Sequence, residues 1–224
     1  MIKNISNLGD AALYCDFGNE VNKSINSEVI KYFKTIKEKK FKGINNLTPS
    51  YNKLIISYDL KRTNFKEVKE YIENLNIEDV PKINSKKLVI PVCFHKTFSM
   101  DIERLEKILN LNREKILENF LNKEYFCYMT GFIAGMPFLG DLDKNMRAQR
   151  LETPRVKVPK GSVALTEQFA NIYTFESPGG WNILGNTPLN VFDSTKEDKP
   201  NLINPGDIIV FKKITLDQYK NFNE

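Results

Sequence analysis

Apolar residues recur along the first third of the chain at two different spacings. Short apolar runs are typical of strands, whereas apolar side chains three and four residues apart are typical of helices. The pattern predicts strands at 11–17 and 53–60 and helices at 24–40 and 64–75. These four elements predict a small α/β sandwich at the start of the chain.

Polar residues mark the ends of the first predicted helix. Ser24 or Asn26 could cap its N-terminus. Lysines run from 34 to 42, and their simplest interpretation is a solvated face whose charge favours the helix C-terminus. An Asn-Asn pair and a proline between 45 and 49 then predict a turn into the next strand.

Glycine separates this first part from the rest of the chain. Three glycines precede residue 130 and eight follow it, so the later part is expected to consist of strands and tight turns. Residues 79–86 are polar and contain proline, which is typical of a linker. We therefore expect an N-terminal α/β domain at 1–84 and a second domain at 85–224.

The second domain is predicted to be mostly β. One helix is expected at 101–119, with Asp101 as a possible cap. Short strands separated by glycine and proline turns suggest a closed barrel, so the fold class is α+β. The predicted strands are 88–94, 125–132, 162–166, 171–176, 181–185, 188–193 and 207–214.

Composition and charge exclude several classes of protein. The 224 residues are 41% hydrophobic and 27% charged, which is typical of an ordinary folded protein. The net charge of +5 is mild, and nucleic-acid-binding domains usually carry denser basic clusters. We therefore expect no nucleic-acid binding. No apolar run of about 18 residues is present, so we also expect no membrane span.

Cysteine and histidine offer no metal site. Cys15, Cys93 and Cys127 are scattered, His95 is the single histidine, and none of them has zinc-ligand spacing. Each cysteine is best interpreted as a small buried residue on a strand, and His95 as a surface or strand-end residue. An odd cysteine count without a disulfide framework favours the cytoplasm.

Three blocks carry the candidate chemistry. GFIAGMPFLG (131–140) could bring backbone N–H groups to an anion or carbonyl, or it could be a tight barrel corner. TPRVKVPKGS (153–162) places Arg155 and Lys157 two apart, so an extended chain could present both to a carboxylate or phosphate, or leave them as surface cations. ESPGGW (176–181) is a turn that could place its serine or glutamate at a cavity mouth.

In order and spacing, these blocks resemble the family of KipI and the 5-oxoprolinase B-subunit, also called allophanate hydrolase subunit 1 or the carboxyltransferase C–D subdomain. GDAAL, KLIISYDL, LVIPVCF and NPGDIIVF also fall where that family has equivalents, so the resemblance covers nearly the whole chain. It implies a small α/β domain followed by a cyclophilin-like β-barrel.

The resemblance also implies an activity. The chain would act with a KipA-like subunit (carboxyltransferase A–B) and a LamB/YcsF-like subunit to hydrolyse the lactam 5-oxoproline to glutamate at the expense of ATP. Such an enzyme needs an anion cradle and a carboxylate clamp, and the glycine loop and Arg155 suit these tasks. The candidate catalytic residues are Arg155, Lys157 and Ser177, and the candidate substrate-binding residues are Gly131, Phe132, Gly135, Pro137, Gly140, Ser162, Glu176, Gly179 and Gly180.

Several positions depart from the family pattern and put the standard substrate in question. Ala134 and Met136 replace a proline and a phenylalanine, and Phe120 stands where a histidine is frequent. Residues 168–171 (QFAN) replace Gly-Gln-Thr-Gly. Phe169, together with Phe94, could lie at a partner surface or be buried in the core.

Two other functions share the same motifs. The chain could be a KipI-like inhibitor of a histidine kinase, or a carboxyltransferase-type subunit that acts on urea or another amide with a biotin carrier. In the oxoprolinase interpretation, ATP is shared with the partner subunits, the chain holds no metal, and it is inactive alone.

Overall fold

The computed structural model describes residues 1–77, 85–197 and 199–222. The chain forms two compact units, Met1–Asn84 and Ser85–Glu224, and each is described by itself. The predicted linker at 79–86 lies almost entirely outside the described residues.

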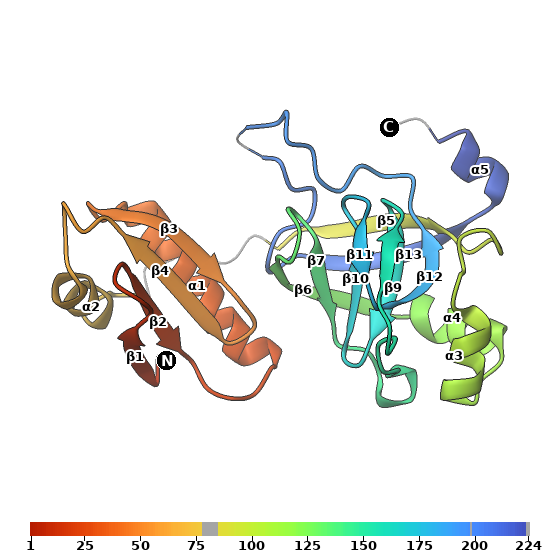
Figure 1. Cartoon of the computed structure of the whole chain (residues 1–224), viewed down its shortest axis with the longest axis horizontal. Coiled ribbons are helices and arrows are strands. Elements are labelled where there is room, and N and C mark those ends of the chain that lie inside the picture. Colours follow the sequence, from red (N-terminus) through yellow and green to blue (C-terminus); the bar gives the residue numbers. More distant parts are fainter. Residues whose placement is uncertain (78–84, 198, 223–224) are drawn as a thin grey trace. The chain divides into compact units, whose positions relative to one another are not determined.

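The first unit is a four-stranded antiparallel sheet with two helices (Figure 1). Alternate residues of the central strands are buried and the residues between them are half-exposed, so the helices cover one face of the sheet. This confirms the predicted α/β sandwich. In sheet order the strands are β1 (Asn4–Asn7), β2 (Ala12–Asp16), β4 (Lys53–Tyr58) and β3 (Ile44–Pro49), and the helices are α1 (Lys23–Lys39) and α2 (Phe65–Glu73).

Two local predictions in this unit were wrong. Asn22, rather than Ser24 or Asn26, caps α1, because its side chain accepts the Ile25 N–H. Asn26 is buried and donates instead to the carbonyls of Ser50 and Tyr51. The residues expected to form a turn at 45–49 belong to edge strand β3, because an irregularity in pairing with β4 accommodates the asparagines.

Asp16 links strands β2 and β4 through an ion pair. Its Oδ1 accepts from Lys53 Nζ (2.5 Å) and from the Gly18 N–H (2.7 Å). The Lys53 hydrogen bond is the main reason why the pKa of Asp16 lies below its ordinary value. A depressed pKa in the folded state means that the pair stabilises the fold above the unfolded pKa of about 3.9. That contribution is lost as the pH falls through the folded pKa.

We therefore expect Asp16→Asn to lower the free energy of unfolding at neutral pH by about 0.5–1 kcal/mol, the range for a partly exposed pair. The difference from wild type should shrink as the pH falls below about 4. Urea unfolding at a series of pH values measures this difference. A stability difference that is constant from neutral to acidic pH would contradict the assigned role of Asp16.

The second unit is a closed barrel of seven strands in the order β10-β7-β6-β13-β5-β12-β9 (Figure 1). Strands β5 and β13 are parallel, and every other pair in the barrel is antiparallel. Two further strands, β8 and β11, pair with each other. The strands are β5 (Lys87–Cys93), β6 (Glu124–Thr130), β7 (Pro137–Gly140), β8 (Arg155–Val158), β9 (Ser162–Thr166), β10 (Phe169–Ile172), β11 (Ser177–Gly179), β12 (Asn182–Asn186) and β13 (Ile208–Ile214).

The helix predicted at 101–119 is two helices. Asn110 adopts the left-handed conformation (φ 52°) and ends the first, and the Asn112 side chain caps the second. The apolar stripe continues across this break because both helices pack on the same core. The helices of this unit are α3 (Ile102–Leu109), α4 (Arg113–Leu121), the 3₁₀ turn η1 (Lys144–Met146) and α5 (Leu216–Lys220).

Two predicted strands differ from the structure. The strand expected at 171–176 ends at Ile172. Residues 188–193 form no strand beyond one bridge between Phe192 and Asn201. Val191 is nevertheless buried in the barrel core, so a loop packed on the barrel shows the same alternation of apolar residues as a strand.

The described residues show no metal centre and no membrane-crossing helix. No group of three His, Cys, Asp or Glu side chains among them could hold an ion. No helix found there is both long and apolar enough to span a bilayer. Cys15, Cys93 and Cys127 are free, buried and on strands, which confirms their interpretation as structural residues.

Candidate functional site

The glycine-rich segment 131–140 is the turn between β6 and β7, followed by β7 itself. The Gly131 N–H donates to the Met136 carbonyl (3.0 Å), and the Met136 N–H is also bonded within the turn. Gly135 has φ 70° and packs on the Phe192 ring, which a Cβ would approach to 2.4 Å. Two N–H groups of the proposed anion cradle are therefore already bonded, and the segment has the geometry of a tight barrel corner.

The other candidates in this segment are spread along it. Pro137 begins β7 and Gly140 ends it. The Gly140 α-carbon lies against the rings of Tyr128 and Phe169, so its missing side chain serves packing. Phe132 differs from the rest, because it is 70% exposed and has φ 69°. Bulky residues rarely adopt a positive φ, and those that do cluster at functional sites.

Arg155 on β8 forms an ion pair with a buried carboxylate. Its Nη2 lies 2.5 Å from Asp101 Oδ1, and Asp101 Oδ2 accepts the Ile183 N–H at 2.7 Å. Asp101 is the N-cap residue of α3, as predicted, but its side chain makes no capping hydrogen bond. The Arg155 Nη1 atom is buried and has no hydrogen-bond partner within the described parts of the chain. The Arg155 side chain is 25% exposed, but its buried Nη1 atom is thus available to an acceptor on a ligand.

Lys157 does not join Arg155 at one carboxylate. Its Nζ pairs with Glu176 Oε1 at 2.9 Å, and the two side chains are 75% and 57% exposed. The two cations therefore meet different acids, because Asp101 holds Arg155 and the exposed Glu176 holds Lys157. Arg155 has the more desolvated environment of the two.

A buried tyrosine lies beside Arg155, and sequence reasoning missed it. Burial raises the pKa of Tyr173, whereas the Asn171 side chain, the Trp181 N–H and the charges of Arg150 and Arg155 oppose the increase. The Tyr173 hydroxyl lies against Gly179, where a Cβ would be only 2.2 Å away. The hydroxyl is thus enclosed by hydrogen-bond donors and two cations.

Two more polar atoms of this cluster have unused hydrogen-bonding capacity. Asn171 Oδ1 and Ser177 Oγ are buried without a partner among the described residues. Ser177 shares β11 with Gly179, and Asn171 contacts Tyr173. Unpaired buried polar atoms are costly, so their concentration here marks a candidate binding site. In the sequence, Asn171 and Tyr173 lie two positions apart just before the ESPGGW block, and this spacing was the signal that could have assigned them to the site.

The remaining candidate residues support this cluster through the backbone. Ser162 is buried on β9, and its carbonyl accepts the Tyr173 N–H (2.9 Å). The Gly180 carbonyl accepts the Leu151 N–H (2.7 Å), and its α-carbon lies near the Arg150 side chain. These contacts position the cluster without adding a reactive side chain.

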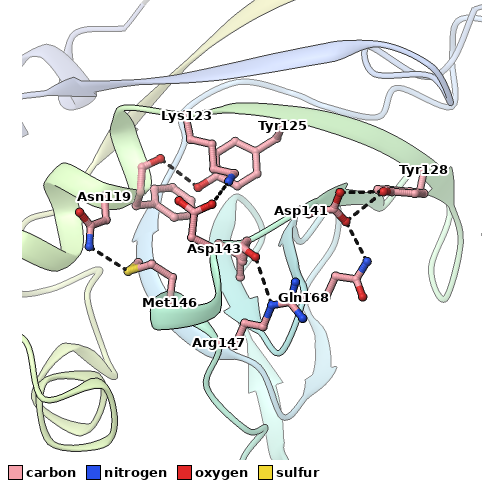
Figure 2. Close-up of polar contacts among 11 residues, drawn as sticks. Asn119, Lys123, Tyr125, Tyr128, Asp141, Asp143, Met146, Arg147 and Gln168 are labelled. Carbon is pink, nitrogen blue, oxygen red and sulfur yellow. Dashed lines mark hydrogen bonds and ion pairs between the residues drawn. The ribbon is translucent and has the colours of Figure 1, made fainter. Parts of the chain in front are cut away.

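A second polar network, drawn in Figure 2, surrounds Asp141. Its two carboxylate oxygens accept from the Tyr128 hydroxyl (2.9 Å each), and Oδ1 also accepts from Gln168 Nε2 (2.8 Å). Burial and then the Asp141 carboxylate raise the pKa of Tyr128. Gln168 stands where the family pattern has glycine. The contacts of Asp141 therefore tie the segment after β7 to β6 and to the residue before β10.

The other departures lie mainly in the core. Phe120 stacks on Phe211 with ring centroids 4.8 Å apart, and Phe94 is 3% exposed. Met136 is buried, whereas Phe169 is half-buried between two aromatic rings. His95 lies two residues after the end of β5 and contacts Thr97, as expected for a residue near a strand end.

Comparison with known proteins places this geometry in a family. The model of the carboxyltransferase domain, subdomain C and D, matches residues 3–203. The chain belongs to this family. The 5-oxoprolinase B-subunit of Bacillus subtilis (strain 168) is 33% identical over 232 residues, which cover 98% of this chain and 96% of the relative. The 5-oxoprolinase B-subunit of Haemophilus influenzae is 33% identical over 170 residues, covering 75% of this chain and 76% of that protein.

Solved structures agree with the family assignment. The protein TTHA0988 superposes with a TM-score of 0.81 at 28% identity over 91% of this chain, which spans 40% of that longer protein. The fold agrees with the expected α/β domain followed by a cyclophilin-like barrel.

Proposed function

We propose that this chain is the B-subunit component of a cytoplasmic, ATP-dependent 5-oxoprolinase. The observation that carries the proposal is the similarity to the Bacillus subtilis 5-oxoprolinase B-subunit over nearly the full length of both chains. Its partners would be a KipA-like and a LamB/YcsF-like subunit, and ATP would be consumed as a substrate shared with them.

The chemistry of the reaction suits the Arg155 cluster. A lactam carbonyl is a poor electrophile, and transfer of the γ-phosphoryl group of ATP to its oxygen would activate it. One water would then open the ring to an acyl phosphate, and a second would release phosphate and glutamate. Arg155 Nη1 would bind the substrate carboxylate and Asn171 Oδ1 would accept its ring N–H, and the buried, unpartnered state of both atoms among the described residues supports these roles.

An exposed apolar surface near this cluster fits a partner subunit. Phe132, Val156 and Phe175 are 70%, 80% and 42% exposed. The turn that carries Phe132 is fixed to the Phe175 segment, because Thr174 Oγ1 donates to the Ala134 carbonyl (2.6 Å). Covering these side chains with a second protein would also desolvate the site.

We expect Phe132→Asp to weaken the complex with the KipA-like subunit at least about tenfold, since it places a charge in an apolar contact. Ile108→Asp, which changes an exposed apolar residue on α3, is the matched control. Calorimetric titration measures both affinities. An unchanged affinity for the Phe132 variant would show that the partner binds elsewhere.

The proposed function is tested by reconstitution. The three subunits are co-purified, and 5-oxoproline-dependent ATP hydrolysis is measured with and without this chain. We expect turnover only when all three are present. A complex that forms but whose ATP hydrolysis does not respond to 5-oxoproline would contradict the assigned substrate. Other lactams and amides would then be tested. Failure to form any complex would contradict the subunit assignment itself.

A further inference from the structure

The first unit contains a cavity of about 490 Å³ at the end of α1. Four cationic residues, Lys37, Lys40, Lys42 and Arg62, line it, and no acidic side chain is among its described lining residues. Ile36 and Phe33 contribute apolar surface. The cavity is therefore lined by cationic and apolar side chains together.

Some cations of this unit pair with a carboxylate, among them Arg62 with Asp59 (3.4 Å), whereas the three cavity lysines do not pair with any residue that the structure describes. Lys31, Lys53, Lys66 and Lys69 each lie within ion-pair distance of a carboxylate. Within the described part of the chain, no such ion pair forms at Lys37, Lys40 or Lys42, and Lys37 lies over the Phe33 ring instead. Like charges gathered around a concave surface repel one another, and a bound anion relieves that repulsion.

The backbone fixes the positions of these charges. Lys40 has φ 46° and Gly43 has φ 101°, so the chain reverses tightly between them. Gly43 packs on Thr63, whose Cγ2 would be 2.8 Å from a Cβ at this position. A Cβ at Gly43 would also lie 3.3 Å from the Cβ of Arg62, the residue before Thr63. The turn therefore holds Lys40 and Lys42 near Arg62. A turn fixed in this way presents the cations together in the folded chain.

We propose that this cavity binds a polyvalent phosphate compound. The volume is in the range of small-molecule sites, and lysine ammonium groups are effective phosphate ligands. An added peptide strand suits the place less well, because edge strand β3 has a pairing irregularity and ends at Pro49, which lacks an N–H. The proposal does not rest on the oxoprolinase assignment, because the site lies wholly within residues 33–62.

Binding to the full chain alone tests the proposal. ATP, tripolyphosphate and adenosine are titrated calorimetrically into wild type, into Lys37→Gln/Lys40→Gln/Lys42→Gln, and into a control, Lys107→Gln/Lys144→Gln/Lys213→Gln. The control removes the same charge from exposed lysines of the second unit. We expect the cavity variant to bind the phosphate compounds at least about tenfold more weakly and the control to bind like wild type.

The ligands separate the possible sources of the phosphate. Tighter binding of ATP than of tripolyphosphate would identify the ligand as a nucleotide, whose base the Phe33 and Phe41 rings favour. Equal binding of the two would identify the ligand as inorganic polyphosphate. Either result supports the proposal. Adenosine binding as tightly as ATP would overturn it. Equal weakening in both triple variants, or no binding of either phosphate compound to wild type, would also overturn it. Circular dichroism verifies that each variant is folded.

Discussion

An Arg155→Ala variant of the assembled enzyme is expected to lose at least about a hundredfold in 5-oxoproline-dependent ATP turnover, the effect of removing a charged hydrogen-bond donor from a desolvated site. The same change should destabilise the fold. Asp101, whose side chain is 5% exposed, would keep the Ile183 N–H but lose its counter-ion. Stranding a buried carboxylate costs about 3–5 kcal/mol.

A second variant separates the two roles of Arg155. In Arg155→Ala/Asp101→Asn the buried charge is gone, so much of the stability should return. If Arg155 binds substrate through Nη1, turnover will nevertheless stay low. Recovery of turnover together with stability would show that Arg155 only holds Asp101. Lys157→Ala is the matched control, since Lys157 is exposed and its loss should change stability by less than about 1 kcal/mol.

Gly179→Ala is expected to destabilise the second unit by about 2–3 kcal/mol, because its Cβ would lie 2.2 Å from the Tyr173 hydroxyl oxygen. Tyr173 is 1% exposed, so neighbouring side chains enclose its ring. The expected fall in Tm is about 4–12 °C for a unit of this size. Differential scanning calorimetry measures it.

The neighbouring glycine supplies the control. A Cβ at Gly180 would meet the Arg150 Nη2 at 3.1 Å, and this side chain belongs to an exposed residue that can move. Gly180→Ala should therefore change the free energy of unfolding by less than about 1 kcal/mol. Adding Tyr173→Phe to Gly179→Ala removes the closest contact and should recover part of the loss. Equal Tm values for the two alanine variants would contradict the close packing of Gly179 on Tyr173.

Local patterns were sufficient for most elements of the chain. The apolar runs at β4, β5, β9 and β13 and the helical spacing in α1 and α2 each predicted the observed element, because each element buries apolar side chains in a core. The motif blocks also identified the family. Patterns failed where a residue's conformation depends on distant contacts: a buried loop at 188–193 imitates a strand, and Asn110 interrupts a continuous stripe.

The candidate site shows the same division. Residue types and spacing pointed to Arg155, Ser177 and the glycines, since charge and turn propensity belong to the local chain. Which charges meet is set by long-range packing. Asp101 and Arg155 are 54 positions apart, and the barrel brings them within 2.5 Å. Tyr173 and Asn171 gain importance only because closing the barrel removes water from them and leaves polar atoms without partners. Such desolvation depends on what surrounds a residue in space, and no local pattern contains that information.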